Sequence, residues 1–427
     1  MTGVHAPGFP EAAVRARARH GTAEVFPAAD GYGQRLFGAG GEDVPEPTDD
    51  LDAARLVPPV FMPQRLEKLI DLAREPIHDD VELTTTIGGF RSPLPVYVSA
   101  FGSTRIAAGD AGLATSRQAG RLGIPMVIGE NLVPVGGYRR AAGSESPILA
   151  RLRAYAAECP PQLGGVVVQQ STEDADSEVW NLVYSDPSVR ELVESGRLAF
   201  ELKTGQGAKP GLGGMTVVDA ADAARLADRF AVRDVLGDGG WLRCATPGTF
   251  TEEILRQQVR FMRNNFPRAR VWVKFHPGRD VGHAAATAWQ AGADAVTVDG
   301  AQGGTGWAPR AFLGQVGLPL GECLRRIGTP TGCLLASGRI WEGGRAVKAL
   351  AAGATAVGLG RAALLAVDTD AEHGLVRLVE ALALEARLLV SALGRYTAAA
   401  LTPDDLWWPG SPATTAVPTL DTIGGRA

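Results

Sequence analysis

The chain has 427 residues, and 42 Lys and Arg against 47 Asp and Glu give it a formal net charge of −5 at pH 7. This balance argues against a nucleic-acid coat or a basic membrane-binding protein, and the hydrophobic content of 45% supports a large buried core. No apolar run reaches the ~18–20 residues that span a bilayer, and the amino-terminal residues lack the basic-then-apolar pattern of a secretion signal. We therefore expect a cytoplasmic protein that binds neither membrane nor nucleic acid.

The four cysteines lie far apart in the chain, and no two of them form a Cys-x-x-Cys pair. This spacing argues against a disulfide scaffold and against a compact zinc or iron–sulfur site, so we expect no bound metal. The cysteines are Cys159, Cys244, Cys323 and Cys333.

Residues 1–90 mix polar and apolar side chains, and we expect them to form an amino-terminal extension or lid. Within this region the run RARAR at 15–19 predicts a solvated helix face. The acidic, proline-broken stretch at 41–50 predicts a loop.

From residue 91 onward, short β-branched, apolar runs alternate with longer Ala-rich stretches. This alternation predicts parallel strands joined by crossover helices, and eight such units predict an α/β fold, a closed (β/α)8 TIM barrel over 91–365. A C-terminal helical segment and an irregular tail should follow over 366–427. The predicted strands are 96–100, 125–129, 165–169, 198–203, 270–275, 293–299, 333–337 and 356–359. The predicted helices are 109–122, 220–236, 251–265, 282–291, 342–352 and 372–393.

In a (β/α)8 barrel the active site lies at the carboxyl ends of the strands. The seventh and eighth predicted strands both end in glycine-rich loops, SGR at 337–339 and GLGR at 358–361. Glycine lets backbone N–H groups approach phosphate oxygens, and Arg339 or Arg361 can add a bidentate charge. We therefore expect a phosphate site here. The loop after the sixth strand, DGAQGGTGWAP at 299–309, favours close approach of a planar or phosphorylated ligand.

Charged side chains occupy the ends of the fourth and fifth predicted strands. Glu201 and Lys203 alternate onto one face of a strand, and Lys274 and His276 do the same on the next. Inside a barrel such groups are costly unless they are paired or used, and a lysine there can stabilise negative charge on a ring. For the two lysines, a buried salt bridge with Glu201 or Asp299 is the structural alternative.

Three segments of this region carry a family resemblance. The run KTGQGAKPGLGG at 203–214 resembles the K-x-x-Q-G-A-K-P-G-x-G-G signature of the FMN-binding synthase domain of glutamate synthases. The run GGTGWAP at 303–309 resembles the G-G-T-G-x-x-P loop of that family, and VKF at 273–275 resembles its V-K-L strand. The order and spacing agree, and the resemblance covers about residues 55–365.

The resemblance implies FMN, with its phosphate on the loops of Gly338, Gly360 and Arg361 and its pyrimidine edge near Lys274. In that family the reduced flavin passes a hydride to 2-iminoglutarate and gives L-glutamate. Residues expected to take part in catalysis are Lys203, Gln206, Lys274, Glu201 and His276. Residues expected to bind the cofactor are Ala100, Phe101, Gly102, Glu130, Lys274, Asp299, Gly303, Gly304, Thr305, Gly338, Arg339, Gly358, Gly360 and Arg361. Residues expected to bind substrate carboxylates are Lys209 and Arg105.

The sequence also departs from the family. An amidotransferase domain is not recognised, and the three cysteines that hold a [3Fe–4S] cluster after the eighth strand are missing, since no cysteine follows Cys333. Of the family's A-M-S-F-G-x-x-S and T-G-E-G-G segments, AFGST at 100–104 and GEN at 129–131 remain. These departures concern the substrate and the electron route more than the flavin.

We therefore expect an FMN-dependent oxidoreductase acting on a small amino-acid-like or carboxylated substrate, at a CH–NH2 or imine-type centre, through flavin N5. An electron-transfer partner and O2 remain open as the redox partner, and a homo-oligomer remains open as the assembly state. One alternative is an FMN enzyme without net redox, an isomerase or an amino-group transferase; type 2 isopentenyl diphosphate isomerases also use a G-G-T loop. The other is a flavin-binding subunit of a larger synthase. An α-hydroxy-acid oxidase is disfavoured, because that family needs a catalytic histidine where this chain has DGAQ at 299–302.

Overall fold

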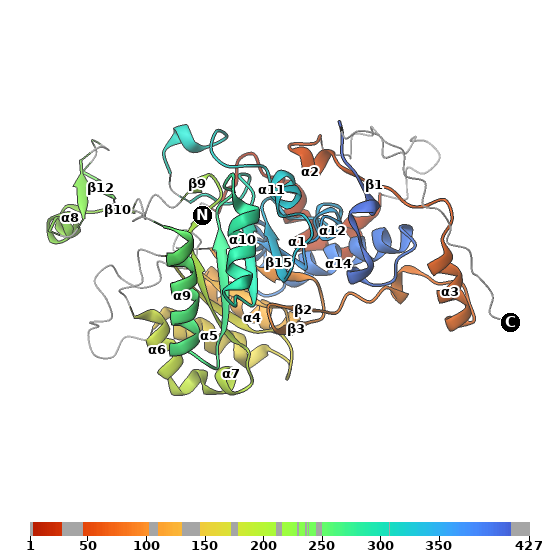
Figure 1. Cartoon of the computed structure of the whole chain (residues 1–427), viewed down its shortest axis with the longest axis horizontal. Helices are drawn as coiled ribbons and strands as arrows, with labels where there is room; N and C mark the ends of the chain where they lie inside the picture. Colours follow the sequence, from red (N-terminus) through yellow and green to blue (C-terminus); the bar gives the residue numbers. More distant parts are fainter. Residues whose placement is uncertain are drawn as a thin grey trace.

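The structure, a computed structural model, describes residues 3–27, 46–101, 110–129, 146–171, 178–210, 216–228, 230–234, 237, 239–244, 250–306 and 308–410. Within these residues, eight parallel strands close into a barrel in the order β4-β5-β6-β7-β13-β14-β15-β16 (Figure 1). Each overlaps a predicted strand, so the predicted barrel is confirmed. The strands are β4 (Val96–Val98), β5 (Met126–Ile128), β6 (Val166–Ser171), β7 (Leu198–Lys203), β13 (Arg270–Phe275), β14 (Ala295–Asp299), β15 (Cys333–Ser337) and β16 (Ala356–Leu359).

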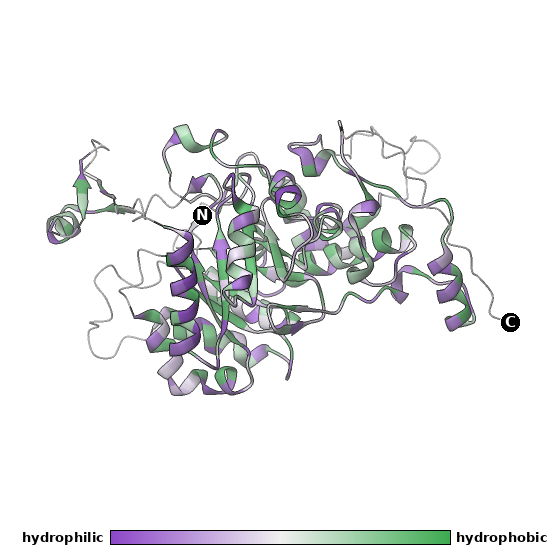
Figure 2. Cartoon of the chain, viewed as in Figure 1, coloured by the Kyte–Doolittle hydropathy of each residue, from purple (hydrophilic) through white to green (hydrophobic). Residues whose placement is uncertain are grey.

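Helices surround the barrel, and Figure 2 shows the hydrophobic residues concentrated in its strands. The helices of the barrel and its carboxyl-terminal extension are α4 (Ala111–Leu122), α5 (Pro147–Glu158), α6 (Val179–Ser185), α7 (Arg190–Glu194), α9 (Glu252–Asn265), α10 (Val281–Gln290), α11 (Leu320–Ile327), α12 (Gly343–Ala351), α13 (Arg361–Thr369) and α14 (Gly374–Ala392). Five of the six predicted helices agree with α4, α9, α10, α12 and α14. No helix in the described part of the chain combines the length and apolar character needed to cross a bilayer.

The strands alternate between two hydrophobic environments, because successive side chains of a strand point to opposite faces. On β13, Val271 and Val273 join the core beneath the helices, whereas Trp272 joins the core inside the barrel. Inward residues near the strand starts are apolar, and Trp272 is packed there with Tyr97 in an edge-on arrangement. The amino-terminal half of the barrel interior is therefore a packed hydrophobic core.

A hairpin closes the amino-terminal end of the barrel. It consists of β2 (Thr85–Ile87) and β3 (Phe90–Ser92), paired antiparallel. Ile87 and Phe90 are almost fully buried in the inner core, and Trp272 donates its indole N–H to the carbonyl of Gly88 at 3.1 Å. Access to the barrel interior is therefore left to the opposite, carboxyl end.

A small subdomain is inserted between β7 and β13. The hairpin of β8 (Gly205–Gln206) and β9 (Lys209–Pro210) is followed by an antiparallel sheet in the order β10-β12-β11 and by α8 (Ala220–Leu226), drawn to the left in Figure 1. The sheet strands are β10 (Thr216–Val218), β11 (Ala231–Arg233) and β12 (Trp241–Cys244). The predicted helix over 220–236 is therefore wrong beyond Leu226, because Ala231–Arg233 pair with β12 instead.

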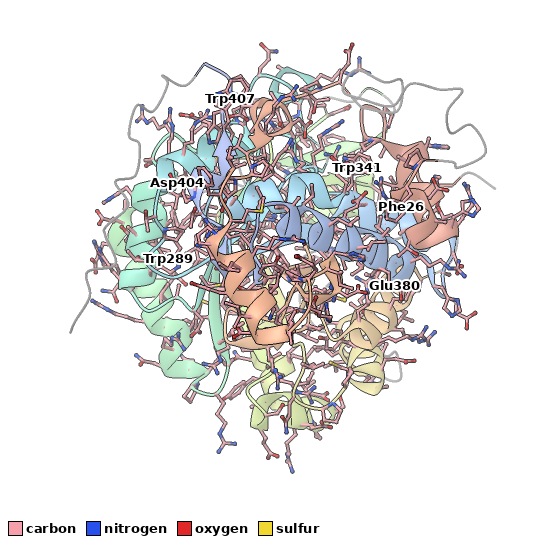
Figure 3. The ribbon with its side chains drawn as sticks, turned by 90° about the vertical axis from the view of Figure 1, so that its right-hand side faces the viewer. Phe26, Trp289, Trp341, Glu380, Asp404 and Trp407 are labelled. Atoms are coloured by element: carbon pink, nitrogen blue, oxygen red, sulfur yellow. The ribbon has the colours of Figure 1, made fainter. Side chains whose placement is uncertain are left out.

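The amino-terminal segments pack against the last helices of the barrel. In α1 (Glu11–His20), Arg17 is buried, pairs with Glu385 of α14 and lies 4.5 Å over the ring of Trp341, which is labelled in Figure 3. The expected solvated face of 15–19 is therefore wrong at Arg17. Arg345 of α12 is fully buried and binds the carboxylates of Asp49 and Asp52.

The remaining elements are short, apart from α3. Strand β1 (Arg55–Leu56) pairs with β17 (Leu406–Trp407), so the carboxyl-terminal tail, expected to be irregular, contains a strand. The others are α2 (Asp50–Ala53), α3 (Pro63–Leu72) and the 3-10 helices η1 (Gly21–Val25), η3 (His78–Asp80), η5 (Pro187–Val189), η6 (Arg310–Phe312), η7 (Ala398–Ala400) and η8 (Pro403–Asp405).

Candidate active site

A layer of polar side chains lies inside the carboxyl-terminal half of the barrel. Strand register places Lys203 beside Lys274 and Lys274 beside Thr297, all at inward positions. The Lys274 ammonium lies 3.1 Å from a carboxylate oxygen of Asp299, and both side chains are about 5% exposed. The predicted salt-bridge alternative therefore holds for Lys274 with Asp299. Such a pair is strong at close range in a low-dielectric interior and costly to break.

Glu201 lies deeper in the same layer and is 1% exposed. Its carboxylate accepts hydrogen bonds from the Thr297 hydroxyl at 3.0 Å and from the amide of Gln169. Burial raises the pKa of Glu201, and the nearby Lys274 charge opposes that rise. A carboxyl group in this position can hold a proton at a higher pH than an exposed glutamate.

The two loops that carry the family resemblance contact each other at the carboxyl rim, through residues 206–208 of the first and 304–305 of the second. The amide of Gln206 donates to the carbonyl of Gly304 at 3.0 Å, and the Ala208 N–H donates to the Thr305 hydroxyl at 3.1 Å. The N–H of Gly207, whose φ is +46°, donates to Asp299 at 3.2 Å. Asp299 therefore joins the loop of 203–214 to Lys274.

His276 follows β13 at the edge of the same site. Burial lowers the pKa of its imidazole, and Nδ1 is buried without a hydrogen-bond partner among the described residues. A Cβ atom on Gly205 would lie 2.9 Å from this Nδ1, so glycine at 205 leaves room for the ring. This nitrogen is buried against Gly205, so His276 lies at the edge of the site without presenting Nδ1 to the cavity.

A cavity of about 280 Å³ lies beside these loops and contains two guanidinium groups. Arg361 donates to the carbonyl of Gln302, and both burial and the adjacent Arg339 lower its pKa. None of the described residues lining the cavity is acidic. Asp52, which is not among the lining residues, lies 3.7 Å from Arg339 Nε and offsets part of that charge, whereas no carboxylate of the described residues pairs with Arg361. The cavity therefore keeps a net positive charge that favours an anionic ligand. The lining residues are Gly8, Thr48, Ala208, Ala301, Gln302, Gly303, Thr305, Leu313, Gly314, Arg339 and Arg361.

The glycines of the last two strands have different surroundings. Gly338 follows β15 with φ +141°, and its carbonyl accepts from the buried Arg345 at 3.1 Å. Gly358 lies inside the barrel, where a Cβ atom would clash with the Ser99 hydroxyl. Gly360 precedes α13, and nothing lies within 4 Å of where its Cβ would be. Gly360 therefore leaves open space at the first turn of a helix, whereas Gly358 makes room for protein side chains.

The other predicted site residues fall into two groups. Ala100 and Phe101 follow β4 after one intervening residue, Ser99, and Lys209 lies half-buried in β9, so all three are at the carboxyl rim. Gly102, Arg105 and Glu130 lie outside the described residues.

Sequence reasoning missed Gly8 and Thr48, which line the arginine cavity, and Phe9, whose ring lies 4.6 Å from the Arg361 guanidinium. These residues belong to no motif. The one local signal is an aromatic residue between turn-forming residues, PGFP at 7–10, just ahead of a helix.

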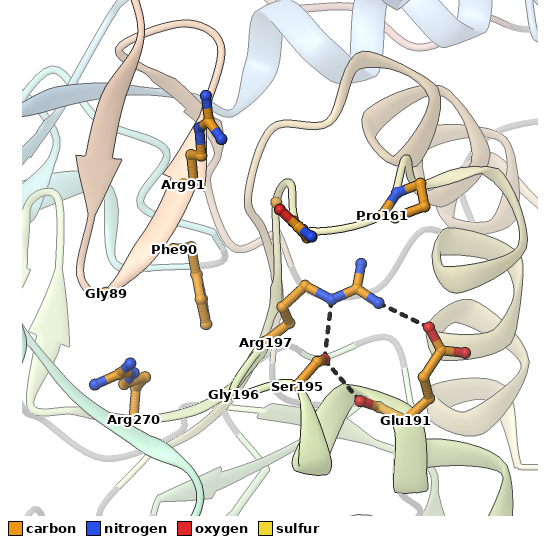
Figure 4. Close-up of a pocket in the computed structure, with 11 residues that line it drawn as sticks. Gly89, Phe90, Arg91, Pro161, Glu191, Ser195, Gly196, Arg197 and Arg270 are labelled. Atoms are coloured by element: carbon orange, nitrogen blue, oxygen red, sulfur yellow. Dashed lines mark hydrogen bonds and ion pairs between the residues drawn. The ribbon is translucent and has the colours of Figure 1, made fainter.

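A second cavity, of about 390 Å³, lies at the amino-terminal end of the barrel (Figure 4). Figure 4 shows Arg91 and Arg270 on opposite sides of Phe90, while Arg197 donates to Glu191 at 2.9 Å and to Ser195 at 3.0 Å. These guanidinium groups do not converge on one point. We assign the functional site to the carboxyl end, where barrel active sites lie and where the buried charges gather.

Residues 188–372 match the family described as "Conserved region in glutamate synthase". The chain is 34% identical over 186 residues to the glutamate synthase large subunit-like protein of Rhizobium meliloti, which is 41% of each chain. It is 32% identical over 184 residues to the archaeal-type glutamate synthase [NADPH] of Dehalococcoides mccartyi, covering 41% of this chain and 36% of that one. The chain thus matches well under half the length of these curated relatives.

Solved structures share the fold. A soluble mutant of the membrane-associated (S)-mandelate dehydrogenase from Pseudomonas putida aligns with a TM-score of 0.53 at 19% identity, over 84% of this chain and 88% of that one. A flavocytochrome b2 variant aligns with a TM-score of 0.52 at 16% identity, over 84% of this chain and 76% of that one. The structural likeness covers 84% of this chain, and the family match contains five of the eight barrel strands, β7, β13, β14, β15 and β16. The similarity to glutamate synthases therefore lies in residues 188–372 of this chain.

Proposed function

We propose that this chain is an FMN-dependent oxidoreductase that acts on a small, amino-acid-like or carboxylated substrate at a CH–NH2 or imine-type centre. The observation that carries the proposal is the meeting of the two family loops above a buried charged layer and beside an arginine cavity. The domain match to glutamate synthases supports the same reaction class. We further propose that residues 91–365 form the flavin-binding domain and that 1–90 cover it.

The donor set fits FMN. A phosphate needs cations and accessible backbone N–H groups, and the cavity provides Arg339 and Arg361 beside glycine-rich loops. The open space at Gly360, at the start of α13, suits close approach of phosphate oxygens. Lys274 is a buried cation at the mouth of the barrel, suited to an electron-rich ring edge. When bound, FMN supplies reversible two-electron chemistry at its N5 atom.

The chain's own residues then have separate tasks. We assign carboxylate binding to Lys203 and Lys209, and orientation of the loop to Gln206, whose amide already holds Gly304. Glu201 can hold a proton on its carboxylate, because burial raises its pKa. His276 stays a predicted proton acceptor, since its ring lies at the edge of the site. Arg105, Glu130 and Gly102 stay as predicted contacts of substrate or flavin.

The first experiment identifies the cofactor. The purified full chain is scanned for flavin absorbance, and the flavin released by denaturation is identified by chromatography. We expect FMN, bound at one equivalent per chain after reconstitution. A protein that carries no flavin and does not bind added FMN would overturn the proposal.

The second experiment tests the substrate class. The reconstituted protein is mixed anaerobically with a panel of amino acids and of hydroxy acids of matched size, and flavin bleaching is recorded. We expect an amino-acid-like compound to reduce the flavin, and Lys203→Met or Lys209→Met to raise its apparent Kd at least tenfold, since each removes one charged contact with a carboxylate. Bleaching by hydroxy acids alone would reject the substrate class. Sustained anaerobic turnover without a donor would instead favour the redox-neutral alternative.

A further inference from the structure

The segment that precedes α1 lies against both arginines of the cavity. The ring of Phe9 lies 4.6 Å from the guanidinium carbon of Arg361 and 5.9 Å from that of Arg339. The carbonyl of Gly8 accepts a 2.6 Å hydrogen bond from Arg339. Phe9 is 8% exposed, so its ring shields one side of the arginine pair from water. Two guanidinium groups that the strand loops supply are thus covered by a residue about 330 positions away in the chain.

The position of Phe9 is set by the helix that follows it. Val14 and Ala18 of α1 are fully buried, and Arg15 forms an ion pair with Asp368 of α13 at 2.9 Å. Arg17 pairs with Glu385 of α14. The helix is therefore fixed to the carboxyl-terminal helices, and Phe9 is held over the arginines by packing rather than by a flexible tether.

An aromatic face is suited to this place. Arg339 and Arg361 repel each other, and burial removes water that would otherwise stabilise them. A cation–π contact restores part of that loss without using any N–H group, because the ring meets the guanidinium face. The N–H groups of Arg361 lie in the plane of the guanidinium group, so the ring does not block them. One of them already donates to the carbonyl of Gln302. Asp52 already lies 3.7 Å from Arg339 Nε, so a second carboxylate in place of Phe9 would remove the remaining positive charge of the cavity and compete with an anionic ligand.

We propose that Phe9, with the carbonyl of Gly8, is a positioning element of the phosphate subsite and makes the protein prefer FMN to riboflavin. This inference rests on the proposed function. Phe9 acts through Arg339 and Arg361: it keeps both guanidinium groups desolvated, side by side and directed at the cavity. The ligand group that benefits is the phosphate monoester dianion, and the isoalloxazine ring gains nothing from Phe9.

The test compares two ligands that differ by that phosphate. FMN and riboflavin are titrated into the flavin-free full chain, and Kd is measured from flavin fluorescence for the wild type, Phe9→Ala, Phe9→Leu and Phe9→Tyr. Phe26→Ala is the matched control, because Phe26 lies in the same amino-terminal segment, is 57% exposed and is labelled at the side of the molecule in Figure 3.

We expect Phe9→Ala to raise the Kd for FMN about tenfold and to leave the Kd for riboflavin within twofold of the wild type. Phe9→Leu, which keeps apolar volume without a π face, should also weaken FMN selectively, whereas Phe9→Tyr and Phe26→Ala should not. Equal weakening of both ligands, or no weakening in Phe9→Ala, would overturn the inference while leaving FMN binding intact. A wild type that binds neither flavin would overturn the proposed function itself.

Discussion

Replacing Lys274 by methionine tests whether the charged layer of the barrel is held together by this lysine. The substitution keeps the approximate length of the side chain and removes the ammonium group that lies 3.1 Å from a carboxylate oxygen of Asp299. The Asp299 side chain is 5% exposed. Removing one partner of such a buried pair costs about 3–5 kcal/mol. With an unfolding entropy of about 2.1 cal/mol/K per residue, a chain of 427 residues has about 0.9 kcal/mol/K, so Tm should fall by about 3–6 °C.

The loss should also depend on pH. Lys274 opposes the rise in the pKa of Glu201 that burial causes, so the variant raises that pKa further. A carboxyl group whose pKa is raised by folding stabilises the fold below its unfolded pKa and loses that contribution as pH rises through the folded pKa. The Tm deficit of Lys274→Met against the wild type should therefore be larger at pH 8 than at pH 5.

Scanning calorimetry of the flavin-free protein measures both effects. Lys68→Met is the control, because Lys68 lies half-buried on α3, with its ammonium 5.9 Å from the Tyr396 ring, a contact worth about 0.5–1 kcal/mol at an exposed site. It should lower Tm by about 1 °C or less at either pH. A Lys274→Met variant that melts with the wild type at pH 8, or shows the same deficit at both pH values, would refute this reasoning.

Three further substitutions probe the fold around the site. Glu201→Gln cannot ionise, so its Tm should improve relative to the wild type as pH rises above about 4.5, the ordinary pKa of the group; a constant difference would contradict the raised pKa. Gly358→Ala places a Cβ atom against the Ser99 hydroxyl and should cost about 1–3 kcal/mol in the free energy of unfolding, with part recovered when Ser99→Ala is added; full stability of the single variant would argue against this close packing. Arg345→Met leaves Asp49 buried without its partner and should cost about 3–5 kcal/mol and speed proteolysis within residues 46–53, whereas an unchanged cleavage pattern would show that this ion pair does not hold the segment.

The barrel can be predicted from the sequence because each of its strands is marked by a pattern of neighbouring residues. Each strand is a short apolar run, and the period of two along a strand already placed Glu201, Lys203 and Lys274 on inward positions. Since parallel strands end at the same edge, the loops at 203–214 and 303–309 were expected at one rim, and their hydrogen bonds confirm it.

The errors arise where partners are distant in sequence. The Ala-rich stretch 220–236 favours a helix by propensity, but Ala231–Arg233 become a strand because β12 offers them a ladder partner. The sequence around Arg17 is typical of an exposed helix face. The residue is buried because Glu385 of α14 and the ring of Trp341 pack against it. The local signal at Phe9, the run PGFP at 7–10, does not show where the ring packs for the same reason: the arginines that it covers lie at the opposite end of the chain.

The hairpin that closes the amino-terminal end of the barrel has a kinetic consequence. With Ile87 and Phe90 filling that end, the described part of the chain leaves the carboxyl rim as the opening to the barrel interior. For the proposed oxidoreductase, an oxidant and a reductant that use this one opening would compete for it, so the product of the first half-reaction would leave before the second reactant binds. Such alternation gives parallel lines in double-reciprocal plots of initial rate, the kinetic pattern of a ping-pong enzyme.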